Sequence, residues 1–171
     1  MKGSITSVQE LILALEEGPG QDGYLSILKR LQIPVRDLVP LCTWHQKHYT
    51  RNCLSRNADF ELFLICYEKG QRTSIHDYDS QEAWVHPVSG EVTEERFALG
   101  PNGALRLVNS TVLRPPTFSY MHNGSSVHRY VNTHDGRSIT LNLYAKPLRK
   151  WKVYDETTGD PSTMSPGPQD R

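Results

Sequence analysis

Three side chains on two short β-rich segments have the types and spacing of a metal site. His76 and Tyr78 lie two residues apart in the segment 70–78, and His128 lies in a later segment, 127–132. Residues two apart on a strand face the same side, so His76 and Tyr78 share a face. In a rolled antiparallel sheet, distant strands face each other across the interior. A divalent ion could then lie between the two imidazoles, with Tyr78 as the third group.

Each of these side chains also has an ordinary structural explanation. A histidine beside Ile75 on a strand could be a hydrogen-bonded core residue, and Tyr78 could be an aromatic residue of the sheet core. Asn132, four residues after His128, is expected to brace a turn rather than to bind a ligand. The pairing of two histidines with a third group favours the metal site.

A helical region precedes the strands and covers residues 1–48. Ser7 and Glu10 have the spacing of a capping box, which predicts that a first helix begins there. Asp22 is placed to cap a second helix, after a Gly-Pro-Gly break. Pro34 then opens a third short segment.

Residues 49–156 read as a β-sandwich, because short β-rich runs alternate with turn residues. We expect strands at 51–55, 61–67, 73–78, 83–88, 91–97, 110–113, 118–122, 128–131, 139–145 and 152–155. Ten strands at this spacing predict a double-sheet sandwich or a small barrel. The tail, residues 157–171, is rich in Pro, Gly, Ser and Asp and is expected to be loosely ordered. Together these regions form one expected domain, 1–171.

The charge balance removes several classes of partner. The 171 residues carry 19 Lys and Arg against 19 Asp and Glu, so the net charge is zero and no basic excess supports nucleic-acid or anionic-membrane binding. The longest apolar run, Phe60–Tyr67, has the length of a strand and not of a membrane span. We expect no secretory signal in the first residues and reduced cysteines at positions 42, 53 and 66, as in a cytoplasmic protein.

The two chemistry-bearing segments resemble the two cupin motifs: a glycine, five residues, His76, one residue and a third-ligand position, then His128-x-x-x-Asn132. Six ordered segments are more narrowly similar to the thiol dioxygenase family. They are Tyr49–Asn52, Phe60–Leu62, Ile75–Asp77, His128–Arg129, Leu141–Tyr144, and Tyr154–Asp155 with Thr158–Gly159. The resemblance implies an all-β cupin fold, a double-stranded β-helix, with short N-terminal helices.

The resemblance also implies a function. In that family a non-heme ferrous ion binds a small thiol carboxylate and O2, and the thiol, for example cysteine, is oxidised to its sulfinic acid. By position, His76 and His128 match metal ligands, and Arg51 matches the arginine that pairs with the substrate carboxylate. Tyr49 resembles a tyrosine near that carboxylate, and Tyr144 matches the catalytic tyrosine. The expected assembly is a monomer or weak oligomer.

Three positions depart from the family pattern. Tyr78 stands where the second histidine ligand is expected, Asn142 where a histidine supports Tyr144, and Ala83 where some relatives carry a cysteine that cross-links to that tyrosine. A tyrosine must lose a proton to ligate well, and its phenolate favours Fe(III) over Fe(II). The metal is therefore expected to be Fe(II), with Fe(III) or another divalent metal as alternatives. The alternative function is a non-catalytic or altered-activity cupin that binds a metal or a small carboxylate.

Overall fold

The computed structural model describes residues 3–78, 82–122 and 126–166 and divides the chain into two compact units, with the boundary after Cys42. The first unit contains α1 (Val8–Glu16), α2 (Leu25–Leu28), α3 (Val35–Leu38) and the 3-10 turn η1 (Val39–Leu41). All the helices that the structure describes are too short and too polar to cross a membrane.

The first helix begins where its capping residues predict. The Ser7 hydroxyl accepts a hydrogen bond from the Glu10 backbone N–H at 3.2 Å, and the Glu10 carboxylate accepts one from the Thr6 N–H at 2.7 Å. The second helix differs from the prediction: Tyr24, not Asp22, precedes α2, and no side chain caps it. The Ile27 and Leu28 N–H groups both donate to the Tyr24 carbonyl, so this single turn begins at Tyr24 and not at Asp22.

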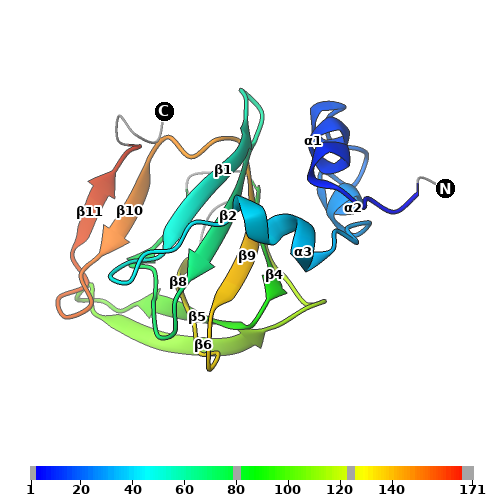
Figure 1. Ribbon diagram of the computed structural model, residues 1–171. Helices are drawn as coiled ribbons and strands as arrows, with labels where there is room; N and C mark the ends of the chain where they lie inside the picture. Colours follow the sequence, from blue (N-terminus) through cyan, green and yellow to red (C-terminus); the bar gives the residue numbers. More distant parts are fainter. Residues whose placement is uncertain (1–2, 79–81, 123–125, 167–171) are drawn as a thin grey trace. The chain divides into compact units, whose positions relative to one another are not determined.

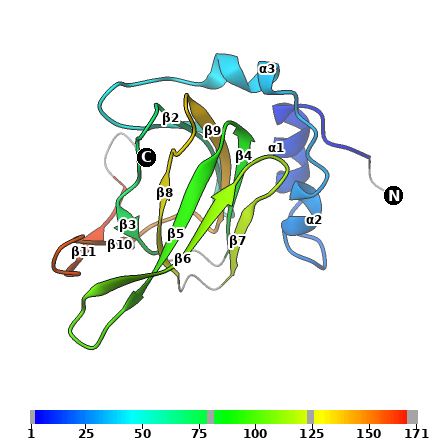
Figure 2. The same cartoon turned by 90° about the horizontal axis from the view of Figure 1, so that it is seen from below.

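Two antiparallel sheets build the second unit (Figures 1 and 2). The first sheet has the order β1 (Thr50–Arg56), β2 (Glu61–Tyr67), β9 (Ser138–Ala145), β4 (Glu82–Ser89), β7 (Ser119–His122). The second has the order β11 (Pro161–Met164), β10 (Trp151–Tyr154), β3 (Ile75–His76), β8 (Val127–Val131), β5 (Val92–Leu99), β6 (Leu105–Leu113). The non-consecutive neighbours in both sheets are those of a rolled sandwich, which confirms the predicted all-β architecture.

The core lies between the sheets. Every residue of β2 and of β9 is buried, since both strands are central in their sheet. Phe63, Ile65 and Tyr67 of β2 pack in one apolar cluster with Val92 and Tyr130 of the opposite sheet. The turn between β4 and β5 depends on Gly90, whose φ is +69° and whose missing Cβ would meet Ser138 and the Arg137 carbonyl.

The C-terminal segment differs from the expected loosely ordered tail. The Asp155 carboxylate accepts hydrogen bonds from the backbone N–H groups of Thr157 and Thr158, both at 2.8 Å. This turn lets Pro161–Met164 return as β11 against β10. Composition suggested a loose segment, although an Asp followed by small polar residues and a glycine is also a tight turn. Residues 167–171 lie outside the described residues.

The boundary between the helical and β regions also differs from the predicted position after residue 48. The Thr43 hydroxyl donates to the Asn52 side-chain oxygen at 2.7 Å, and the Thr43 carbonyl accepts from the Thr50 hydroxyl at 2.5 Å. These bonds attach residues 43–49 to β1. The β unit therefore begins several residues earlier than the change in composition indicates.

Candidate metal and substrate site

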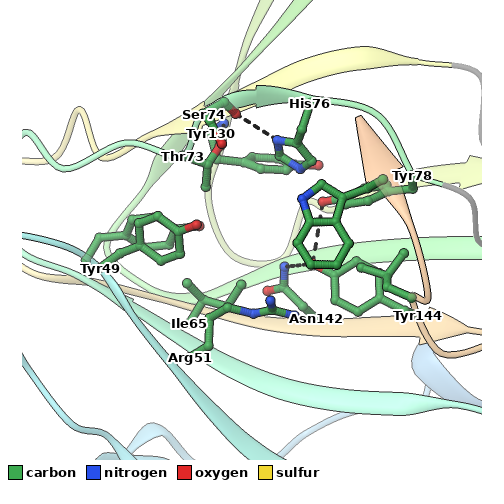
Figure 3. A pocket seen from close by; sticks show the side chains of 13 residues that line it. Tyr49, Arg51, Ile65, Thr73, Ser74, His76, Tyr78, Tyr130, Asn142 and Tyr144 are labelled. Atoms are coloured by element: carbon green, nitrogen blue, oxygen red, sulfur yellow. Dashed lines mark hydrogen bonds between the residues drawn. The ribbon is translucent and has the colours of Figure 1, made fainter. Parts of the chain in front are cut away.

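Two histidines and a tyrosine meet between β3, β8 and the residues after β3. Figure 3 shows His76 and Tyr78 of this group. His76 and His128 are directly opposite each other in the β3–β8 pair, and their ring centroids are 4.6 Å apart. The ring of Tyr78 lies 4.9 Å from His76 and 4.7 Å from His128. The three side chains that the spacing singled out thus form one cluster.

Backbone carbonyls determine the tautomer of both histidines. Nδ1 of His76 lies 2.7 Å from the Ser74 carbonyl, and Nδ1 of His128 lies 2.6 Å from the Ser126 carbonyl. A carbonyl only accepts hydrogen bonds, so each Nδ1 carries the proton and each Nε2 keeps a lone pair. Burial lowers the pKa of His76 to about 4 and the pKa of His128 well below its ordinary value. Both rings are therefore neutral at pH 7, the form that ligates a metal.

The Nε2 atom of His128 is a buried acceptor with no hydrogen-bond partner within the described parts of the chain. Its residue is fully buried. Buried polar atoms are nearly always bonded, and a ligand is one explanation of an exception. With its Nδ1 held by a carbonyl, His128 has the arrangement typical of metal-ligating histidines. The imidazole pair fits a divalent transition metal.

Tyr78 fits a metal less well. Its hydroxyl is 3.4 Å from the hydroxyl of Tyr144. Burial, followed by the neighbouring Tyr144 and Tyr130, raises its pKa well above the usual value near 10. The group is thus a neutral phenol at pH 7 and a weak ligand. In the described residues no three His, Cys, Asp or Glu side chains cluster as a metal site, so no further side chain of these types joins the two imidazoles.

Asn142 supports Tyr144 from the same face of β9. Its side-chain N–H donates to the Tyr144 hydroxyl at 3.2 Å, and its carbonyl oxygen accepts from the Thr140 hydroxyl at 2.7 Å. The Tyr144 oxygen accepts from Asn142, so its own proton is available to another acceptor. Ala83 lies directly opposite Tyr144 in the β4–β9 pair. An alanine methyl forms no thioether, as the sequence predicts.

A cavity of about 70 Å³ opens beside this cluster. Its wall includes Tyr49, Arg51, His76, Tyr78, Asn142 and Tyr144. The Arg51 guanidinium lies over the Phe63 ring, 4.5 Å from the centroid, which holds it in place by a cation–π contact. Because one water needs roughly 10–15 Å³ of such volume, the cavity admits a molecule of a few heavy atoms. The expected substrate residues Tyr49 and Arg51 and the expected catalytic residue Tyr144 thus share one small space.

Further residues of the cavity wall were not foreseen: Tyr67, Thr73, Tyr130 and Trp151. One pattern could have located Tyr67. Arg51 pairs with Ile65 in the β1–β2 register, so a residue two positions after Ile65 lies on the same face as Arg51. Tyr130 has the same relation to His128 on β8. The run of apolar residues on β2 concealed this alternation, because both of its faces are buried.

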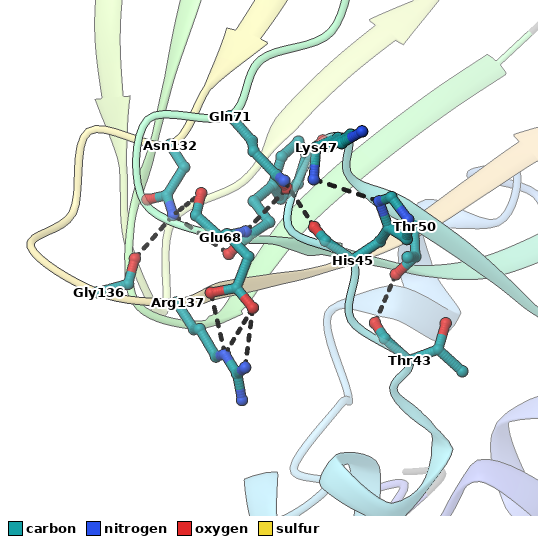
Figure 4. A network of polar contacts seen from close by, with 10 residues as sticks. Thr43, His45, Lys47, Thr50, Glu68, Gln71, Asn132, Gly136 and Arg137 are labelled. Carbon is teal, nitrogen blue, oxygen red and sulfur yellow. Dashed lines mark hydrogen bonds and ion pairs between the residues drawn. The ribbon is translucent and has the colours of Figure 1, made fainter.

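Asn132 braces the loop between β8 and β9, as expected (Figure 4). Its side-chain N–H groups donate to the carbonyls of Tyr67, Glu68 and Gly136 at 3.3, 3.0 and 2.8 Å. Its side-chain oxygen accepts from the Ser138 hydroxyl at 2.8 Å. A single buried amide therefore joins the end of β2, which carries Tyr67, to the segment between the strands.

Comparison with known proteins agrees with this geometry. Residues 36–157 match the family described as cysteine dioxygenase type I. The cysteine dioxygenase type 1 of Danio rerio is 24% identical over 144 residues, which are 81% of this chain and 72% of that protein. That of Homo sapiens is 29% identical over 118 residues, 67% of this chain and 59% of that protein. The match thus spans less than two thirds of the human protein.

A solved structure supports the fold. A cupin superfamily protein from Desulfitobacterium hafniense aligns with a TM-score of 0.51 at 13% identity, over 64% of this chain and 88% of that chain. At this identity the likeness concerns the fold alone. Because the family match covers most of the sequence, including every strand that carries a residue of the site, this chain belongs to the cysteine dioxygenase type I family and has its cupin fold.

Proposed function

We propose that this chain is a non-heme iron thiol dioxygenase that oxidises a small thiol carboxylate, such as cysteine, to its sulfinic acid. The observation that carries the proposal is the neutral imidazole pair of His76 and His128, set beside a small cavity whose wall contains Arg51. In the reaction both atoms of O2 are bonded to sulfur. The sulfur loses four electrons, and O2 gains them.

His76 and His128 would hold the iron through their Nε2 atoms. Bound iron supplies a Lewis acid that stabilises the thiolate and brings O2 to it. The protein contributes the orientation of the two rings, which the Ser74 and Ser126 carbonyls hold. Fixed ligand rings keep the donor atoms at one spacing, and this lowers the cost of assembling the site.

Arg51 would bind the substrate carboxylate. A guanidinium can donate two parallel hydrogen bonds to a carboxylate, which fixes its direction as well as its distance. Contact with Phe63 limits the side chain to one region of the cavity wall. Tyr49, on the same wall, would contribute to this end of the substrate. The thiol end is then directed to the imidazole pair, and this fixed orientation of the substrate raises the reaction rate.

Tyr144 would donate a hydrogen bond to the oxygen or sulfur of the substrate. Its oxygen already accepts from Asn142, so the proton of the hydroxyl is directed elsewhere. In the structure described here the Tyr78 hydroxyl is the neighbour at 3.4 Å, a long contact that a substrate atom can replace. Asn142 thereby performs with an amide the support expected from a histidine.

The test is turnover by the iron-loaded protein. Cysteine and 3-mercaptopropionate are supplied separately, with O2 uptake and sulfinate formation followed together. We expect one O2 consumed for each sulfinate formed, and its loss in His128→Ala. No turnover of either thiol acid by protein that holds iron stoichiometrically would overturn the proposal.

A second candidate is a cupin that binds a metal or small carboxylate without oxidising it. The neutral phenol of Tyr78 at the third donor position favours it, because a two-imidazole site holds iron less tightly. Carboxylate binding without turnover would support this second function. For either function we propose a reducing, cytoplasmic setting and a monomer or weak oligomer. The three cysteines of the chain, at positions 42, 53 and 66, are all free.

A further inference from the structure

The hydroxyl of Tyr67 is a buried polar group with no hydrogen-bond partner in the described residues. Tyr67 is fully buried at the end of β2 and lines the cavity. Burial raises the pKa of Tyr67, and the neighbouring Thr140 side chain lowers it as a hydrogen-bonding neighbour would. The Thr140 hydroxyl donates to Asn142 at 2.7 Å and keeps its capacity to accept, but the Tyr67 hydroxyl forms no hydrogen bond of ordinary length and angle with it. Native proteins rarely leave such a group unbonded.

The other buried tyrosines of the same cavity differ in this respect. The Tyr78 and Tyr144 hydroxyls lie 3.4 Å from each other. The Tyr130 hydroxyl donates to the Glu94 carboxylate at 3.1 Å, a carboxylate that also accepts from Ser119 at 2.7 Å. Tyr67 is therefore the buried phenol of this wall whose donor capacity the described protein groups leave unused.

Its position suggests what the hydroxyl binds. Tyr67 lies two residues after Ile65, which pairs with Arg51, so Tyr67 and Arg51 are diagonal neighbours on one face. Diagonal residues are roughly 7–8 Å apart at the backbone, within reach of two long side chains. The Tyr67 ring also stacks on Tyr49, with centroids 5.5 Å apart. The free donor is thus on the Arg51 side of the cavity.

The charge of the cavity selects an anion. Among the described residues that line it, Arg51 is the charged side chain, and none is Asp or Glu. A phenol O–H beside a guanidinium offers a further donor to a carboxylate, which has two oxygens to satisfy. An ammonium group would find no acidic partner on this wall.

The Tyr67 backbone is held in place before any ligand binds. Asn132 donates to its carbonyl at 3.3 Å. Asn132 also donates to the next carbonyl, that of Glu68, at 3.0 Å (Figure 4). Glu68 is paired with Arg137 at 2.8 Å. Since the ring is also stacked and buried, little conformational entropy remains to be lost on binding.

We propose that Tyr67 is a specificity-determining residue, whose hydroxyl donates a hydrogen bond to the carboxylate of the small acid that Arg51 binds. The inference rests on the proposed function for the identity of the ligand as a small carboxylate. It adds a donor that the family resemblance does not supply. Tyr67 is a binding residue and takes no part in the oxidation itself.

The test compares Tyr67→Phe with wild type in binding propionate and 3-mercaptopropionate to the metal-free protein, measured by isothermal titration calorimetry. We expect the affinity of Tyr67→Phe for both acids to fall about tenfold, which corresponds to about 1.4 kcal/mol. The matched control is Tyr120→Phe, which removes a phenol that donates to Glu82 at 3.2 Å and does not line the cavity. Its affinities should equal those of wild type.

Thermal unfolding separates this role from a structural one. If the Tyr67 hydroxyl has no partner in the unliganded protein, Tyr67→Phe should be at least as stable as wild type. A lower unfolding temperature, unchanged carboxylate affinity, or absence of carboxylate binding by wild type would each overturn the inference. In the iron-loaded protein the same variant should raise KM about tenfold and leave kcat within about twofold. Tyr67-dependent propionate binding without thiol turnover would reject the proposed function and uphold the inference.

Discussion

Replacing Tyr78 by histidine tests whether one residue limits metal binding at this site. The Tyr78 ring lies within 4.9 Å of His76 and 4.7 Å of His128, so an imidazole at position 78 would complete a three-histidine cluster. For a phenol with a pKa of 10, loss of the proton at pH 7 costs about three pKa units of free energy, or roughly 4 kcal/mol. Burial raises the pKa of Tyr78 further, so metal binding through the phenolate is weakened by at least this deprotonation cost.

A neutral imidazole ligates without that loss. We therefore expect Tyr78→His to bind a divalent metal about 10²–10³-fold more tightly than wild type at pH 7, since each 1.4 kcal/mol is a factor of ten. Zn(II) is the suitable probe because it undergoes no redox change, and competition with a chromophoric chelator gives the affinity. Fe(II) is measured in parallel without oxygen.

Tyr78→Phe is the matched control, because it keeps the ring and removes the oxygen. If the phenol remains protonated, the Phe variant binds Zn(II) as tightly as wild type. A tenfold weaker affinity of Tyr78→Phe would show that the phenolate ligates the metal, and the reasoning would be refuted. Equal affinities of Tyr78→His and wild type would refute it as well.

Three further changes have defined outcomes. Arg51→Lys removes the planar guanidinium and its contact with the Phe63 ring. The KM for a thiol acid should therefore rise at least tenfold, while kcat changes little. Unchanged steady-state kinetics would contradict the role of Arg51 in binding the carboxylate. Asn132→Ala removes the five hydrogen bonds of a buried side-chain amide. The free energy of unfolding, measured by urea titration, should fall by about 3 kcal/mol. A decrease of less than about 1 kcal/mol would contradict the bracing role of Asn132. His76 takes up a proton near pH 6.5 in the unfolded chain but only near pH 4 in the metal-free folded protein. The free energy of unfolding should therefore fall by about 3 kcal/mol as the pH decreases from 6.5 to 4. An NMR titration of His76 in the folded protein with a midpoint near pH 6.5 would contradict this.

Local patterns were sufficient to predict the fold class and most of the strands. The alternation of apolar residues and the Gly, Pro and Asn breaks place the expected β4 and β9 within a residue or two of the observed Glu82–Ser89 and Ser138–Ala145. Strand parity also places His76 and Tyr78 on one face, since that depends only on the two-residue period of a strand. Such predictions succeed because their causes act within a few residues of the chain.

The C-terminal hairpin shows where local composition is insufficient. Residues 161–164 carry no apolar alternation and are exposed, yet they form β11 because β10 presents a free edge after a tight turn. The edge that receives them is itself paired with β3, which comes from the middle of the chain. Strand pairing over such separations depends on the whole sheet, so the local sequence of the segment does not predict it.

By itself the sequence determined which chemical groups this protein has: two imidazoles, a guanidinium, and a tyrosine and an asparagine at positions where the family resemblance leads us to expect histidines. Only the tertiary structure decided how they meet. The β3–β8 register sets His76 opposite His128, and the Ser74 and Ser126 carbonyls select the Nδ1–H tautomers. It also decided that Tyr67 enters the cavity with an unbonded hydroxyl. Pairing register and burial are properties of contacts between distant strands, so residue types and spacing do not specify them.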